Sequence, residues 1–153
     1  MALPSVLIAG CGDVGTRLAL QLAAEGWTAY GLRRSIQALP EPIRPVAGDL
    51  TVAQCPADWP QGPIDYLVYC AAATVHDEAG YRTAYIDGLR HVLAWLKQGR
   101  QTPRRLLFVS SSGVYGQQDG SWVDEDSPTE ATGFSGKVMA EAEQLALDST
   151  IAA

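Results

Sequence analysis

The chain has 153 residues, of which 47% are hydrophobic and 18% charged, and its net charge is −6 at pH 7. This composition is typical of one globular domain that can bury a proper core. The acidic balance, with an isoelectric point near 4.7, argues against nucleic acid or an anionic membrane as the main partner, because both bind basic surfaces. No apolar run approaches the length of a membrane span, and the N-terminus lacks the pattern of a secretory signal. We therefore expect a cytoplasmic protein.

Three cysteines are scattered along the chain and match no zinc-binding spacing. Cys11 and Cys70 lie at the ends of predicted strands, where a buried thiol behaves as a small hydrophobic group. We expect these two and Cys55 to be reduced, and we expect no metal site. The alternative is a reactive thiol at Cys11, because the N-terminus of a following helix lowers a thiol pKa.

The stretch VLIAGCGDVG, residues 6–15, is the strongest local pattern in the chain. It begins with an apolar run, Val6–Ala9, which is typical of a buried parallel strand and leads directly into the glycines. A helical pattern follows at once, with Val14, Leu18 and Leu22 at i, i+4 and i+8. Strand, glycine turn and helix in this order are the context that a G-x-G-x-x-G dinucleotide-binding motif requires.

Each glycine of this motif has a separate predicted role. Gly10 permits the tight turn, Gly12 lets the main chain approach a pyrophosphate, and Gly15 lets the helix pack closely on the strand. The N–H groups around Asp13 and Val14 favour an anion, because they lie at the positive end of the helix dipole. A Walker-type phosphate loop is excluded, since no Gly-Lys-Ser/Thr sequence follows. A purely structural turn is the alternative.

Two arginines follow the second predicted strand, Thr28–Leu32. Arg33 and Arg34 stand about 20 residues after the glycines, where an NAD-preferring Rossmann unit places an acidic residue for the ribose 2′-hydroxyl. A guanidinium there favours a 2′-phosphate, through forked and charge-assisted hydrogen bonds. We therefore predict NADP as the cofactor. NAD is the alternative if the arginines are only solvated surface side chains.

The remaining pattern alternates between strands and helices. A third strand is predicted at Val46–Leu50 and a fourth at Ile64–Cys70, after which three alanines leave room for a flat ligand. A helix follows over 77–98, then a strand at Arg105–Val109 and a last helix, Ser135 to about Leu147, with a frayed tail. This alternation predicts an α/β fold, a doubly wound parallel sheet of the Rossmann type with strand order 3-2-1-4-5, over residues 1–153.

Five motifs carry a resemblance to a known family: GCGDVG at 10–15, GDL at 48–50, AAA at 71–73, SSSGVYG at 110–116 and VDEDSPTEATGFSGK at 123–137. With them the chain resembles the N-terminal part of the extended or atypical short-chain dehydrogenases/reductases, the NAD(P)-dependent epimerase/dehydratase group. Extended members continue into a C-terminal substrate lobe that this chain lacks. The chain is therefore expected to be a fragment of a longer protein, or a minimal domain whose open fifth strand invites homo-oligomer formation.

The resemblance also implies where the cofactor lies. The backbone from Gly10 to Gly15 would hold the pyrophosphate, and Asp49 and Leu50 would border the adenine. The edge that lines the ribose and nicotinamide side consists of Ala71, Ala72 and Ala73.

The family's catalytic residues are only partly present. The catalytic serine matches Ser111, whose hydroxyl would hydrogen-bond the reacting oxygen of the substrate, and the lysine of Tyr-x-x-x-Lys matches Lys137, which would hold the nicotinamide ribose. The tyrosine position is Gly133. Loss of a positioned acid/base lowers a rate on the order of 10²–10⁴-fold. The alternatives are a satisfied loop serine at Ser111 and a solvated Lys137 spaced to pair with Glu141.

Three functions remain in view. The first is an NADP(H)-binding domain of an oxidoreductase that moves a hydride between nicotinamide and a carbinol or carbonyl carbon of a small-molecule substrate; the resemblance implies a nucleotide sugar. The second is a sensor or scaffold that binds the cofactor without chemistry, for which Gly133 is the evidence. The third is a flavin- or nucleotide-binding domain that uses the same glycine turn.

Overall fold

The computed structural model describes residues 2–153, which form a five-stranded sheet in the order β3-β2-β1-β4-β5. All neighbouring strands run parallel. The strands are β1 (Ser5–Ala9), β2 (Thr28–Arg33), β3 (Arg44–Ala47), β4 (Tyr66–Tyr69) and β5 (Arg105–Phe108). The predicted Rossmann fold and its strand order are therefore confirmed.

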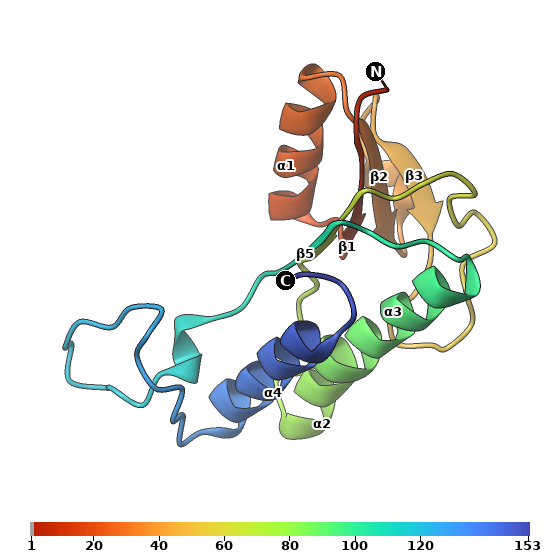
Figure 1. The fold of residues 1–153 in the computed structure, drawn as a ribbon. Coiled ribbons are helices and arrows are strands. Elements are labelled where there is room, and N and C mark those ends of the chain that lie inside the picture. The colour runs from red at the N-terminus through yellow and green to blue at the C-terminus, as the bar shows by residue number, and fades with distance from the viewer. Residues whose placement is uncertain (1) are drawn as a thin grey trace.

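Helices cover both faces of this sheet (Figure 1). The helices are α1 (Asp13–Ala24), α2 (Glu78–Tyr81), α3 (Gly88–Gln98) and α4 (Phe134–Asp148). A π-helical segment, Arg82–Asp87, joins α2 to α3, so that these elements form one continuous rod, and α4 packs beside it. Two short 3-10 turns lie at Ile36–Ala38 and Ser112–Val114. None of the helices in residues 2–153 has the length and hydropathy needed to cross a bilayer.

Strand β1 lies in the middle of the sheet, and all of its residues are buried. Because successive residues of a strand point to opposite faces, Val6 and Ile8 pack in the core under α1, while Leu7 packs with Leu89 and Trp95 of α3. Both faces are thus filled by apolar side chains. A ligand is therefore expected to bind at the carboxyl ends of the strands.

The third strand begins and ends earlier than predicted. It covers Arg44–Ala47 rather than 46–50, so Asp49 and Leu50 lie in the loop beyond it. The side chain of Asp49 explains where the strand stops, because its Oδ1 accepts hydrogen bonds from the backbone N–H (2.9 Å) and the hydroxyl (2.7 Å) of Thr51. Such a local turn competes with strand pairing.

The first helix forms as predicted, and of its apolar residues Val14 is 65% exposed. The helix contacts the sheet through Gly15 and Ala19, which are both buried, with Leu18 and Leu22 packed beside them. A Cβ on Gly15 would lie 2.9 Å from Cγ2 of Ile8. The missing side chain therefore lets α1 lie close on β1, whereas Val14 in the first turn lines the cavities at the carboxyl ends of the strands.

The C-terminal tail is not frayed as predicted. The N–H of Leu106 in β5 donates to the carbonyl of Ala152 at 2.8 Å, so the tail lies along the outer edge of that strand. Leu107 and Val109 remain about half exposed on the sheet face. Self-association through this region stays a prediction.

Candidate functional site

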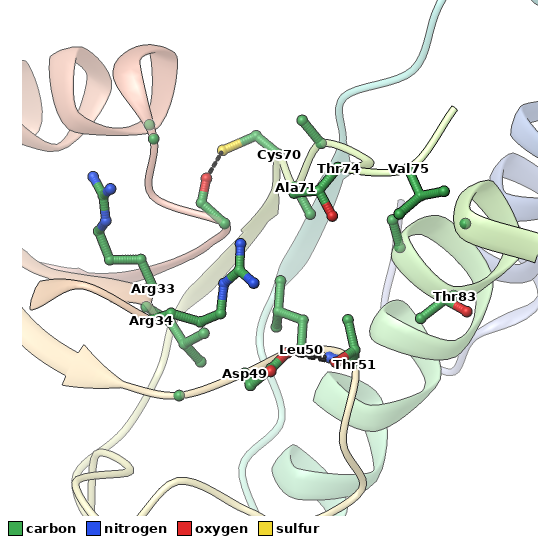
Figure 2. A pocket seen from close by; sticks show the side chains of 18 of the residues that line it. Arg33, Arg34, Asp49, Leu50, Thr51, Cys70, Ala71, Thr74, Val75 and Thr83 are labelled. Atoms are coloured by element: carbon green, nitrogen blue, oxygen red, sulfur yellow. Dashed lines mark hydrogen bonds between the residues drawn. The ribbon is translucent and has the colours of Figure 1, made fainter. Parts of the chain in front are cut away.

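A cleft of about 820 Å³ lies at the carboxyl ends of β1 to β4 (Figure 2). Strand β2 lies on one side of β1 and strand β4 on the other, so the order of the strands reverses at β1. Open α/β sheets bind ligands at such a switch point. The predicted cofactor residues that line the cleft are Gly10, Gly12, Asp13, Val14, Gly15, Arg33, Arg34, Asp49, Leu50, Ala71 and Ala72. The fold thus brings segments far apart in the sequence into one wall.

Two of the predicted cofactor residues lie outside this lining. Ala73 instead donates its backbone N–H to the phenol oxygen of Tyr85 at 3.3 Å. Lys137 is exposed near the start of α4 and has no side-chain hydrogen bond or ion pair with residues 2–153. The alternative pairing of Lys137 with Glu141 is not formed, because both carboxylate oxygens of Glu141 accept from Arg82, at 2.7 and 2.9 Å.

The glycine turn is held tightly against the end of β4. Gly10 has φ +82°, a conformation that favours glycine, and a Cβ there would lie 2.5 Å from Cα of Ala71. Gly12 is different, because a Cβ on it would meet no atom within 4 Å and would stand in the cleft. No side chain caps the N-terminus of α1, so its first-turn N–H groups stay available to an anion.

The two arginines differ in their contacts. Nη1 of Arg33 donates to the carbonyl of Cys11 at 3.3 Å, which ties the end of β2 to the glycine turn. The guanidinium of Arg34 is turned toward the middle of the cleft (Figure 2). It makes no hydrogen bond or ion pair with any described residue. Arg34 therefore keeps all of its donors for a ligand.

Asp49, in the loop after β3, contributes a negative charge to the lining of the cleft. Its hydrogen bonds from the hydroxyl and the backbone N–H of Thr51 lower the pKa of this carboxyl, and the charge of Arg34 lowers it further. The group is therefore an ionised acceptor at neutral pH.

The cysteines of the site are packing groups. Burial raises the pKa of Cys11, which favours a packing role over the alternative of a reactive thiol there. The thiol of Cys70 donates to the carbonyl of Gly10 at 3.3 Å, which is the dashed line beside Cys70 in Figure 2. Burial raises the pKa of Cys70 to about 11. Both thiols stay protonated at neutral pH, and the Cys70 thiol holds the glycine turn next to the end of β4, while the Cys11 thiol packs beside Gly31 of β2 and contacts Thr16 of α1. Residues 2–153 contain no cluster of side chains that could hold a metal ion.

A second cavity of about 320 Å³ adjoins the cleft and shares Val14, Cys70, Ala71 and Ala72 with it. Ser111, three residues beyond the end of β5, lines this cavity, and its Oγ accepts the N–H of Gly113 at 3.1 Å. The neighbouring Ser110 also lines it, and its buried Oγ has no hydrogen-bond partner among the described residues. Ser110 is thus a polar group that only a ligand or water can satisfy.

Two tyrosines of this second cavity were not predicted from the sequence as site residues. Tyr81 and Tyr85 both line it, although neither belongs to one of the five sequence motifs. The signal available in the sequence is that Tyr85 shares one helical stripe with Leu89 and Leu96 in the helix predicted over 77–98. Tyr115, in contrast, donates its hydroxyl to the carbonyl of Asp124 at 3.0 Å and lines neither cavity.

The two cavities fit a dinucleotide. They adjoin at the switch point, where they share four lining residues, and the larger one is lined by the glycine turn, the start of α1 and the unpaired guanidinium of Arg34. The open space at Gly12 is the approach that a pyrophosphate needs.

Comparison with known proteins agrees with this geometry. Residues 6–146 match the NAD dependent epimerase/dehydratase family. The chain belongs to this family. The resemblance carried by the five sequence motifs is therefore confirmed.

Solved structures of this epimerase/dehydratase fold are similar over nearly the whole chain. A Methylobacillus flagellatus protein assigned to the NAD-dependent epimerases/dehydratases is 40% identical, with 94% of this chain and 50% of that one covered and a TM-score of 0.73. A UDP-galactose 4-epimerase shares 20% identity over 94% of this chain and 50% of its own, with a TM-score of 0.76. The Bordetella bronchiseptica enzyme WbmG, solved with NAD and UDP, shares 18% identity over 99% and 51%, also with a TM-score of 0.76.

The chain spans about half the length of these structural relatives. No curated protein matches it in sequence. The two relatives of lower identity show the common fold only.

Proposed function

We propose that this epimerase/dehydratase family member is the NADP(H)-binding domain of an oxidoreductase that transfers a hydride between nicotinamide and a carbinol or carbonyl carbon. The observation that carries the proposal is the unpaired Arg34 guanidinium, which faces the same cleft as the glycine turn. When bound, the cofactor supplies a hydride donor or acceptor at its nicotinamide ring. The residues of this chain hold and orient it.

The cleft has a suitable partner for each part of the cofactor. The N–H groups of residues 13–15 and the backbone at Gly12 would hold the pyrophosphate. Arg34, with Arg33 beside it, would bind a ribose 2′-phosphate, and Asp49 with Leu50 would border the adenine. The nicotinamide end would then extend past the edge formed by Ala71, Ala72 and Ala73 into the second cavity.

A nucleotide sugar is the substrate class that we propose. Relatives of this fold were solved with NAD and UDP or with UDP-glucose and NAD. In this chain Ser111 would donate to the reacting oxygen of the substrate, since it lies at the end of β5 beside the nicotinamide space. Lys137 would approach the nicotinamide ribose only if its flexible side chain turns toward the cavity.

A sensor or scaffold is the second candidate. It is favoured by Gly133, which stands at the family's tyrosine position as the N-cap of α4. Such a protein would bind NADP(H) in the same cleft and perform no turnover.

The test is a titration of the chain with NADPH and with NADH, followed by energy transfer from the tryptophans. Loss of the charge-assisted contacts in Arg34→Ala is expected to weaken NADPH binding about tenfold or more, toward the NADH value. Arg44→Ala is the matched control, because Arg44 lies on β3 over the ring of Tyr30 and outside the cleft. Absence of binding of either nucleotide, or equal loss in both variants, would overturn the proposal.

A further inference from the structure

The start of α4 supplies no phenol to the site. Gly133 is exposed, lines neither cavity, and has no atom within 4 Å of an ideal Cβ. The next residue, Phe134, packs edge-on against the ring of Tyr81 with centroids 5.5 Å apart. If this site exchanges a proton with a substrate oxygen, the group must come from another element.

The helical rod of α2 and α3 places two tyrosines in the second cavity. Tyr81 ends α2, Tyr85 lies in the π-helical segment, and their ring centroids are 5.3 Å apart. A π-helical turn inside a helix is rare and is found most often at functional sites. Ser111 lines the same cavity, so a serine hydroxyl and a phenol meet there from different elements.

The hydrogen bonds of Tyr85 differ from those of Tyr69 and Tyr115, and Tyr85 differs from its cavity neighbour Tyr81 in having a backbone donor on its oxygen. Its phenol oxygen accepts the N–H of Ala73 at 3.3 Å, which fixes the oxygen at the end of β4, and its proton is donated to no described residue. Tyr69 instead donates to the carbonyl of Ala84, and Tyr115 donates to Asp124. A backbone donor on the oxygen stabilises a phenolate, while the unused proton remains available to a ligand.

We infer that Tyr85 is the proton donor and acceptor of this site, in place of a tyrosine at position 133. The inference rests on the proposed function. In the reductive direction a hydride, supplied by a reduced nicotinamide, adds to the carbonyl carbon, and the C=O π electrons form an O–H bond with the proton of Tyr85. The phenolate that remains is reprotonated by water, and the oxidative direction reverses each transfer.

The titratable groups around Tyr85 do not compete for this role. Burial raises the pKa values of Tyr69 at the end of β4 and of Cys70 directly after it. The other neighbouring titratable groups are Tyr81, one turn earlier on the helical rod, and His76 in the loop before α2, whose ring centroid lies 6.2 Å from that of Tyr81. Arg82, which opens the π-helical segment, is paired with Glu141 of α4.

The test measures ionisation of Tyr85 without a substrate. Tyrosinate absorbance is followed from neutral to alkaline pH in the chain alone, with saturating NADP⁺, and with 2′,5′-ADP. The positive charge of an oxidised nicotinamide in the second cavity is expected to lower one tyrosine pKa by about one unit or more. The adenosine fragment 2′,5′-ADP, which lacks that ring, is expected to leave it unchanged.

Two variants assign the shifted group. Tyr85→Phe keeps the ring and is expected to abolish the shift, and Tyr81→Phe, a neighbour in the same cavity, is expected to keep it. Circular dichroism and NADP⁺ affinity show that both variants are folded. NADP⁺ binding with no shift, or a shift that survives in Tyr85→Phe, would overturn the inference and leave the proposed function standing. Failure of NADP⁺ to bind the unaltered chain would overturn both.

Discussion

Gly10 packs directly on the backbone of Ala71, so that a Cβ on Gly10 would lie 2.5 Å from both N and Cα of that residue. This contact joins the turn after β1 to the end of β4, although the two residues are far apart in sequence. The neighbouring Gly12 has open space in the direction of its missing side chain. Two glycines of one motif therefore serve different purposes, the first in folding and the second in binding.

Substitution of each of these two glycines by alanine is expected to distinguish the role in folding from the role in binding. Gly10→Ala is expected to lower the free energy of unfolding by about 2 kcal/mol or more, because it combines a positive φ with a backbone clash. Gly12→Ala is expected to leave that energy nearly unchanged and to weaken NADPH binding, since its methyl group would stand in the cleft. Urea denaturation and the fluorescence titration measure both. Equal destabilisation by the two variants would contradict this explanation.

The isolated Lys137 and the paired Glu141 provide a second comparison. Lys137→Met is expected to leave the unfolding midpoint unchanged, because the side chain is exposed and unpaired with residues 2–153. If the lysine turns to the nicotinamide ribose, the same variant lowers NADPH affinity. Glu141→Gln removes the ion pair with Arg82 and is expected to leave that affinity unchanged. If Glu141→Gln and Lys137→Met change the affinity for NADPH equally, Lys137 does not bind the nicotinamide ribose.

Alkaline pH is expected to destabilise the fold through Cys70. Its pKa is raised by burial from 9.0 to about 11, so the folded state holds the proton more tightly than the unfolded state. The stabilisation is complete below pH 9 and is lost as the pH rises toward 11. Cys70→Ser removes this titration, so its unfolding free energy should fall less steeply over that range in urea denaturation. Parallel pH profiles for both proteins would contradict the assignment.

Ser111→Ala distinguishes an enzyme from a sensor. In an enzyme the loss of this hydroxyl is expected to lower turnover of nucleotide sugars on the order of 10²-fold or more, with cofactor affinity nearly unchanged. The measurement is the change in NADPH absorbance during reaction of the full-length protein. Ser112→Ala is the matched control, because Ser112 is exposed and lines neither cavity. Absence of turnover in the unaltered protein with every nucleotide sugar and either cofactor would favour the sensor.

The order of the strands and the position of the glycine turn follow from local patterns. Residues 6–15 specify a buried strand, a tight turn and a helix through the spacing of apolar residues and glycines alone, and right-handed crossovers then order the sheet. Local patterns do not predict the exposure of Val14 or the end of β3. Val14 is exposed because it lines the open cleft, and β3 ends early because Asp49 forms hydrogen bonds with Thr51.

The sequence by itself therefore determined the fold, the glycine turn and the presence of two arginines near it. Only the tertiary structure decided that Arg33 contacts Cys11 while the guanidinium of Arg34 is turned toward the middle of the cleft, because Arg33 is the last residue of β2 and Arg34 lies in the bend that follows it. It also decided that Tyr85 and Ser111 line one cavity while Lys137 stays outside. These side chains come from elements that are distant in the chain, and the packing of helices on the sheet brings them together.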